Sequence, residues 1–196
     1  MFEAKQFESI NGVEGLSARL MGEHYKLYEG YVKKANEILE KLKTVDRSTA
    51  NAVYSDIRAL KLGYSFALDA IKAHEIFFQN ISGKGGQPQG WLGTAIEKNF
   101  GSYDNWLQDM KATGIAARGW VWTAYDWQTG QLFNFLGDAH DAFPIWHATP
   151  LVALDVYEHA YMIDYGVNRA DYIETFFKNL DWDSVEAQVT KLRIDQ

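Results

Sequence analysis

The stretch TPLVALDVYEHAYMIDYG, residues 149–166, changes character in its middle and indicates a fold that combines strands with helices. The apolar run that ends at Asp155 has the length of a buried strand. The residues after it, VYEHAYMIDYG, and the later segment RADYIETFFKNL have a helical pattern. His159 follows Asp155 by four residues, about one helical turn. A carboxylate and an imidazole can therefore lie side by side here, although an Asp that caps the start of a helix is the alternative.

The segments before this stretch complete an α+β domain. Residues 119–137, GWVWTAYDWQTGQLFNFLG, are rich in aromatic residues, and Thr129-Gly130 is placed as a turn between two strands. Together with the strand that ends at Asp155, this hairpin predicts a small, three-stranded antiparallel sheet. Residues 91–116 have the pattern of helices.

The N-terminal half has a different organisation, that of two long amphipathic helices. Apolar residues recur every three or four positions over residues 17–43 and again over residues 53–81. A turn near Asp46 makes the two helices an antiparallel hairpin. Glycine, glutamine and proline then mark a linker, so we expect an N-terminal hairpin domain over residues 1–83, a linker over 84–90 and a C-terminal α+β domain over 91–196.

Two histidines interrupt the apolar stripes of the predicted hairpin. His24 lies 22 residues before Asp46 and His74 lies 28 residues after it, so their levels along the hairpin differ by only about 9 Å. Either histidine alone fits an ordinary core position. Two imidazoles buried at one level need partners for their ring nitrogens, and a metal ion can partner both. If Asp155 and His159 converge with them, the four form a His3Asp set, which suits iron or manganese, is unsuited to calcium or magnesium, and leaves zinc open.

Composition and motif searches exclude several other classes of protein. The 196-residue chain has no cysteine and a net charge of −7, which disfavours thiolate ligands and nucleic-acid partners. It has no apolar run long enough to span a membrane, and its N-terminus lacks the pattern of a signal peptide, so we expect a cytoplasmic protein. The HExxH, Glu-x-x-His and G-x-S-x-G patterns of zinc proteases, di-iron proteins and serine hydrolases are absent.

The segment LDVYEHAYMIDYG resembles the D-x-W-E-H signature of the iron/manganese superoxide dismutase family. Further similar segments follow the family order: GGQPQG, NFGSYDNW, GWVW, ATPL, NRADY and NLDW. The resemblance implies a hairpin joined to an α+β domain, one manganese or iron ion per chain, and dismutation of superoxide to oxygen and hydrogen peroxide. It also implies four metal ligands, which are His24, His74, Asp155 and His159.

The resemblance extends to residues around the metal. His140 corresponds to the family residue that hydrogen-bonds to metal-bound solvent, although a loop histidine is the alternative. Tyr31 corresponds to a gateway tyrosine, Trp120 to a tryptophan beside the metal and Arg169 to a basic residue of the substrate funnel; ordinary packing or a surface charge is the alternative for each. Glu158 corresponds to a glutamate that crosses the family's dimer interface and implies a homodimer, or a tetramer built from dimers. An exposed glutamate at a helix start is the alternative.

Several family features are missing, and they cluster around the path to the metal. The first helix reads HYKLYEGY and lacks the family's second histidine, and Met162 replaces the tyrosine that partners it. Tyr157 stands in place of a tryptophan, and the N-terminal L-P-x-L segment is not recognisable. The competing hypothesis is therefore a metal-binding protein of dismutase fold with weak or no dismutase activity. The choice between iron and manganese does not follow from ligands that both metals share.

Overall fold

A computed structural model describes residues 1–81, 83–142 and 144–195. It confirms the α+β class and the three-stranded antiparallel sheet. The elements in chain order are the 3-10 turn η1 (Glu8–Ile10), α1 (Ala18–Thr44), α2 (Asp56–Asn80), α3 (Gly90–Phe100), α4 (Tyr103–Ala116), β1 (Trp120–Asp126), β2 (Gln131–Gly137), β3 (Ala148–Asp155), the 3-10 turn η2 (Glu158–Ala160), α5 (Met162–Tyr165), α6 (Arg169–Lys178) and α7 (Trp182–Lys191).

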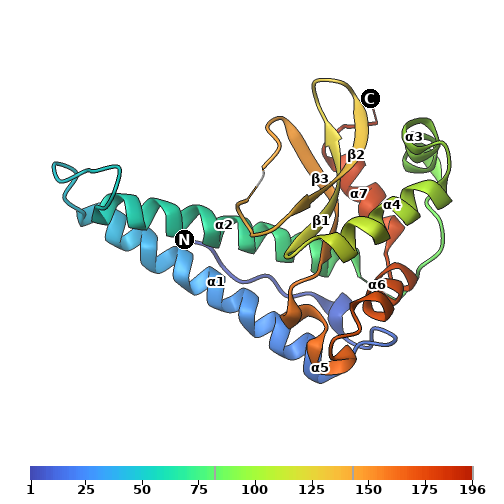
Figure 1. Cartoon of the computed structure of the whole chain (residues 1–196), viewed down its shortest axis with the longest axis horizontal. Coiled ribbons are helices and arrows are strands. Elements are labelled where there is room, and N and C mark those ends of the chain that lie inside the picture. The colour runs from blue at the N-terminus through green and yellow to red at the C-terminus, as the bar shows by residue number, and fades with distance from the viewer. Residues whose placement is uncertain (82, 143, 196) are drawn as a thin grey trace.

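Helices α1 and α2 form the predicted hairpin, and its closed end projects away from the rest of the molecule (Figure 1). Each helix begins at a serine whose side-chain oxygen accepts a backbone N–H: Ser17 from Leu20, and Ser55 from Arg58. Such caps satisfy donors that the first helical turn leaves free. His24 and His74 lie in the halves of the two helices that are nearer the sheet, where both are buried.

The sheet has the order β2-β1-β3, so β1 is central and β3 is an edge strand. Residues Thr129 and Gly130 lie in the turn between β1 and β2, as the sequence predicts, and Gly130 has a φ of 67°, which glycine adopts without strain. Helix α2 packs on β3, and α4 contacts β1 and β2. At the centre of this packing the fully buried Trp106 donates from its indole nitrogen to the hydroxyl of Thr123 across 2.8 Å.

The segment after Asp155 differs from the helix that its pattern predicts. It consists of turn η2 and the short helix α5, separated by Tyr161 with φ −146°. The physical reason lies in the bonds of Asp155, whose backbone oxygen accepts the hydroxyl of Tyr172 across 2.7 Å and whose side chain accepts the N–H of Tyr157. Tyr157 is extended, so a helix cannot start until Glu158. The interpretation of Asp155 as a helix cap was therefore wrong.

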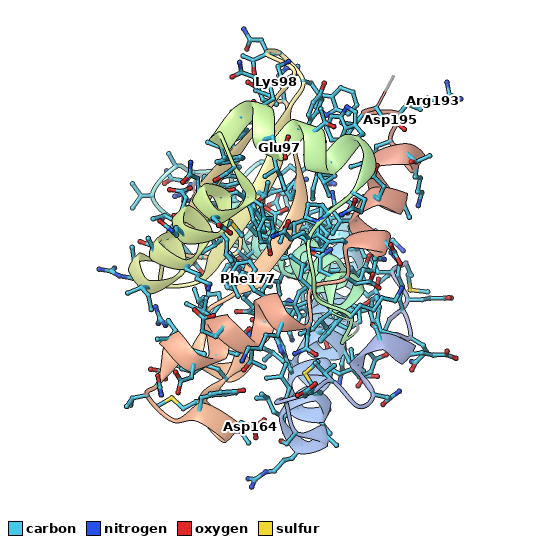
Figure 2. All side chains as sticks on the ribbon, turned by 90° about the vertical axis from the view of Figure 1, so that its right-hand side faces the viewer. Glu97, Lys98, Asp164, Phe177, Arg193 and Asp195 are labelled. Atoms are coloured by element: carbon cyan, nitrogen blue, oxygen red, sulfur yellow. The ribbon has the colours of Figure 1, made fainter. Side chains whose placement is uncertain are left out.

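Contacts of α5 and α7 join the C-terminal half of the chain to the N-terminal hairpin. The carboxylate of Asp164 in α5 accepts the backbone N–H and the hydroxyl of Ser17, and it lies beside the start of α1 (Figure 2). Helix α7, which the sequence did not predict, packs on α2, α3 and β3. These contacts join the hairpin to the C-terminal half and do not separate two domains. The division into domains 1–83 and 91–196 with a linker at 84–90 therefore remains a proposal.

In the part of the chain that the structure describes, no helix has both the length and the apolar character that crossing a membrane requires.

Candidate metal centre

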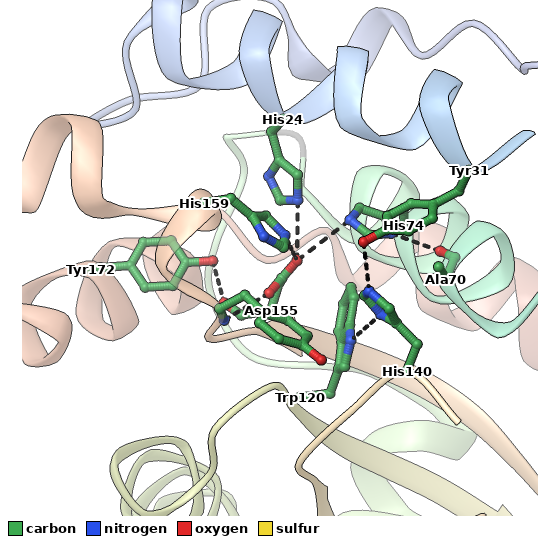
Figure 3. A network of polar contacts seen from close by, with 10 residues as sticks. His24, Tyr31, Ala70, His74, Trp120, His140, Asp155, His159 and Tyr172 are labelled. Atoms are coloured by element: carbon green, nitrogen blue, oxygen red, sulfur yellow. Dashed lines mark hydrogen bonds and ion pairs between the residues drawn. The ribbon is translucent and has the colours of Figure 1, made fainter. Parts of the chain in front are cut away.

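Four side chains from four elements converge on one point inside the molecule (Figure 3). They are His24 from α1, His74 from α2, Asp155 from the end of β3 and His159 from η2. One nitrogen or oxygen atom of each lies within 4.8 Å of the others. The first three are buried and His159 is half-buried. The sequence predicted these four residues, and the structure brings all four together.

The distances within this cluster are close to those between ligands of one metal ion. Oδ2 of Asp155 lies 3.0 Å from Nε2 of His159, 3.1 Å from Nε2 of His24 and 3.7 Å from Nε2 of His74. Two donor atoms at about 2.1 Å from one ion, with an angle of about 90° to 120° between them, lie about 3.0 to 3.6 Å apart. One carboxylate oxygen facing three imidazole nitrogens is therefore a geometry that fits a coordinated cation.

His74 carries the clearest sign that the cluster suits a cation. Its Nδ1 lies 2.6 Å from the backbone oxygen of Ala70, which can only accept, so Nδ1 carries the proton and Nε2 presents its lone pair. Among the described residues, Nε2 has no hydrogen-bond partner although it is fully buried. A buried nitrogen without a partner costs about 1 to 3 kcal/mol. A metal ion supplies that partner, and the bond to Ala70 orients the ring for it.

Three of the four groups in the cluster have the charge that a metal ligand requires. Burial lowers the pKa of His74 to about 3 and also lowers the pKa of His24, despite the carboxylate beside it. Burial opposes a charge on His159 too, but the charge of Asp155 and its hydrogen bond raise the pKa of this more exposed ring. Burial alone would raise the pKa of Asp155, yet His159 and His24 hold it well below its usual range. Two neutral imidazoles and an ionised carboxylate are thus ready to bind a cation without releasing protons.

Tyr172 is a residue of the site that sequence analysis missed. It is fully buried, and its hydroxyl donates to the backbone oxygen of Asp155, which fixes the end of β3 just where the carboxylate leaves it (Figure 3). Burial raises the pKa of Tyr172 well above its ordinary value, so the hydroxyl keeps its proton. The signals in the sequence are the place of this tyrosine in the family-like segment NRADY and in the apolar pattern of the helix over residues 169–178, which ordinary core packing explains as well.

His140, Tyr31 and Trp120 form a hydrogen-bonded row beside the cluster (Figure 3). The indole N–H of Trp120 lies 2.9 Å from Nδ1 of His140, and because an indole only donates, Nδ1 accepts. Burial lowers the pKa of His140 to about 4, so the ring is neutral at pH 7 with its proton on Nε2. Nε2 lies 3.0 Å from the hydroxyl of Tyr31, so the N–H of His140 donates a hydrogen bond to the Tyr31 oxygen. The hydroxyl hydrogen of Tyr31 remains free to donate to another acceptor.

The remaining predicted residues lie outside the cluster. The guanidinium of Arg169 donates to the backbone oxygen of Ala117 at the end of α4 across 2.6 Å, and it packs on the ring of Tyr161. Glu158 is exposed at the start of η2, and Met162 is 40% exposed at the start of α5. None of these three side chains belongs to the group of described residues that could hold the ion.

Comparison with known proteins agrees with this geometry. The family model described as "Iron/manganese superoxide dismutases, C-terminal domain" matches residues 88–188. The chain belongs to the iron/manganese superoxide dismutase family. A protein named superoxide dismutase [Fe] from Aquifex pyrophilus is 37% identical over 194 residues, which cover 96% of this chain and 91% of that protein.

Relatives of this member of the superoxide dismutase family carry either metal in their names. A superoxide dismutase [Fe] from Aquifex aeolicus is 39% identical over 91% of this chain and 86% of its own length. Superoxide dismutase [Mn] 1 from Halobacterium salinarum is 34% identical over 82% of this chain and 79% of its own length. Resemblance to the family thus does not distinguish iron from manganese.

Proposed function

We propose that this chain is a superoxide dismutase that holds one iron or manganese ion per chain with His24, His74, Asp155 and His159. The observation that carries the proposal is the convergence of three imidazole nitrogens on one oxygen of Asp155, at 3.0 to 3.7 Å. The bound ion would supply the one-electron chemistry, in which one superoxide is oxidised to oxygen and another is reduced to hydrogen peroxide. Nitrogen and oxygen donors of this kind suit both metals.

The protein supplies the surroundings in which a small anion can react. The carboxylate of Asp155 is the one anionic group among the four proposed ligands, so a divalent or trivalent ion keeps a net positive charge at the centre. In a buried site of low dielectric this charge attracts superoxide despite the overall charge of −7.

His140, Tyr31 and Trp120 would control a proton at the centre, because peroxide formation consumes two protons for each pair of superoxide ions. Trp120 fixes the tautomer of His140, and His140 donates to Tyr31. Burial and the charge of Asp155 raise the pKa of Tyr31, so its hydroxyl remains protonated at neutral pH and can donate. These contacts support the proposed role of the three residues in positioning a proton beside bound substrate.

The substrate funnel and the subunit interface are further parts of the proposal. Arg169 would add positive charge near the opening, while the exposed Glu158 would pair with the second subunit of a homodimer. Glu158 is exposed on the short turn that also carries His159, one of the proposed ligands. A partner subunit that packs on this turn would contact the residue next to a ligand, which supports the proposed interface.

A second candidate function is metal binding with weak or no dismutation. The observation that favours it is the altered gateway: α1 contains no histidine besides His24, and Met162, with a thioether that cannot donate a hydrogen bond, stands where the family has tyrosine. Proton delivery depends on donors, whereas holding the ion does not. The two candidates therefore differ in activity and agree in metal content.

Assays of the metal-loaded chain separate the candidates. We expect protein loaded with iron or with manganese to dismute superoxide far faster than the same concentration of free ion. Dismutation no faster than that of the free ion, with one ion bound per chain, would leave the second candidate. His74→Ala should abolish metal retention, whereas His147→Ala, a matched change of an exposed histidine outside the centre, should not. Tight retention of one ion by His74→Ala would reject the ligand set.

A further inference from the structure

Asn80 links two elements that bear proposed ligands. It is the last residue of α2, six residues after His74, and it is 1% exposed. Its side-chain oxygen accepts the backbone N–H of Ala153 across 2.9 Å, and its side-chain nitrogen donates to the backbone oxygen of Leu151 across 3.3 Å. Both partners belong to β3, the strand that ends at Asp155. The end of α2 and the strand are thus joined by two direct hydrogen bonds.

These bonds imitate those of a neighbouring strand. Strand β3 is the edge of the sheet, with β1 on its other side. A residue in a parallel strand bonds to two residues that flank its partner, one through its N–H and one through its oxygen. The amide of Asn80 makes the same two bonds to Leu151 and Ala153, which flank Val152. One side chain therefore closes part of an edge that would otherwise leave backbone groups without partners.

The position of this link matters for the centre. Ala153 is two residues before Asp155, and the helix between His74 and Asn80 is regular, so a shift of β3 along α2 would change the distance between the two proposed ligands. We infer that Asn80 is a positioning residue of the metal centre, whose amide holds strand β3 against helix α2 and so sets the spacing of Asp155 and His74. This inference rests on the proposed metal site.

A second buried asparagine provides a matched control. Asn179 is 2% exposed, and its side-chain nitrogen donates to the backbone oxygens of Glu14 and Thr175, each across 2.8 Å. These bonds tie the end of α6 to the N-terminal segment, and neither of these segments carries a proposed ligand. Changes at Asn179 therefore cost buried side-chain hydrogen bonds and leave both bonds between Asn80 and β3 intact.

The test compares Asn80→Asp and Asn80→Ala with Asn179→Asp and Asn179→Ala in the full chain loaded with manganese. Asn80→Asp keeps the size of the side chain and the acceptor for Ala153, but as a carboxylate it loses the donor to Leu151. Three quantities test the inference: the rate of metal loss to a chelator well below the unfolding temperature, the electron paramagnetic resonance spectrum of the bound ion, and the free energy of unfolding without metal. The Asn80 variants should lose metal at least about tenfold faster than the unmodified chain and show an altered spectrum. In the Asn179 variants, the rate of metal loss should change by about twofold or less.

A measurement on the unmodified protein covers variants that fail to fold. Coupling between two sites is reciprocal, so a link that holds the centre together must itself be tightened by the ion. Hydrogen exchange at the backbone N–H of Ala153 should therefore be slower with manganese bound than without it. Equal exchange in both states would overturn the inference. So would unchanged spectra together with rates of metal loss that, in the Asn80 and Asn179 variants alike, depend only on the free energy of unfolding.

The same experiments distinguish this inference from the proposed function. Unmodified protein that retains the ion, depends on Asn80 to do so and does not dismute superoxide would reject the dismutase and leave the role of Asn80 standing. Unmodified protein that retains no iron or manganese would overturn both.

Discussion

Tyr157 lies flat against His159, with ring centroids 5.2 Å apart and ring planes 16° from parallel. Its ring also lies 5.0 Å from that of His140. Gly119 makes room for it, because a Cβ at this glycine would be 2.9 Å from Cε2 of Tyr157. Tyr157, which stands where the family has tryptophan, therefore packs between His159, a proposed ligand, and His140, the proposed proton-controlling histidine.

Tyr157→Ala should weaken the hold on the metal, because His159 loses the ring that fixes its plane. We expect loss of iron or manganese to a chelator to be about tenfold faster. Tyr157→Phe keeps the ring and removes only the hydroxyl, so its rate should match that of the unmodified chain. Identical rates for the alanine variant and the unmodified chain would show that the stacked ring does not orient the ligand.

Gly119→Ala should destabilise the fold. The added methyl group would lie 2.8 Å from the backbone oxygen of Gly137 as well as against Tyr157, and overpacking of this kind costs about 1 to 3 kcal/mol. Gly22→Ala in α1 is the control with the opposite sign, since its Cβ would meet nothing within 4 Å and alanine favours a helix by about 0.5 to 1 kcal/mol. Urea unfolding of the metal-free variants measures both. A stable Gly119→Ala would mean that this contact relaxes freely.

The row of His140, Tyr31 and Trp120 makes a prediction about a single proton. Nitrogen-15 NMR of the metal-free protein should show His140 neutral at pH 7, with hydrogen on Nε2, because the indole of Trp120 occupies Nδ1. Trp120→Phe removes that donor, so both tautomers should then be populated. Hydrogen on Nδ1 in the unmodified protein would contradict the contact and the proton role derived from it.

Acid should destabilise the metal-free protein in a defined range. Burial lowers the pKa values of His24, His74 and His140, to about 3 for His74 and about 4 for His140, whereas the unfolded chain has the ordinary value of about 6.5. Between these values the unfolded state binds more protons, so the free energy of unfolding falls as the pH drops below about 6.5 and continues to fall towards pH 4. His159, with its raised pKa, acts in the opposite direction but is a single group.

Urea titrations at several pH values between 7.5 and 4 measure this loss, and His140→Gln is the informative variant. It removes one of the three buried groups, so its free energy of unfolding should depend less steeply on pH between about 6.5 and 4. The loss linked to Asp155 belongs below its ordinary pKa of about 3.8 and so falls outside this range. An unchanged slope would show that His140 is not buried in its neutral form.

Much of the site was predictable because it lies on regular elements. The apolar stripes of α1 and α2 repeat over six or more turns, so the inward direction of His24 and His74 followed from helix geometry alone. The strand that ends at Asp155 was equally clear. Their meeting depends on the angle between hairpin and sheet, which no local pattern contains, and only the family resemblance brought the four residues together.

Other parts depend on single contacts between distant residues, and these were not predictable. The segment after Asp155 has a helical pattern, but the bonds from Tyr172 and Tyr157 to Asp155 take the place of a regular helix start. Asn80 ends an apolar stripe, where a polar residue usually marks only the end of a helix. Its partners in β3 are more than 70 residues away. His140 lies in a loop, and its place between Tyr31 and Trp120 has no signal in the spacing of residues.

The order of the four proposed ligands along the chain bears on how the protein acquires its ion in the cell. Asp155 comes 131 residues after His24, and His159 is later still. Until Asp155 and His159 are made, a nascent chain therefore exposes two histidines of a hairpin without the other two proposed ligands. Loading of the proposed site has to wait until β3 and the turn after it have left the ribosome and docked on α2, so the complete set of proposed ligands forms only after His159 has been made.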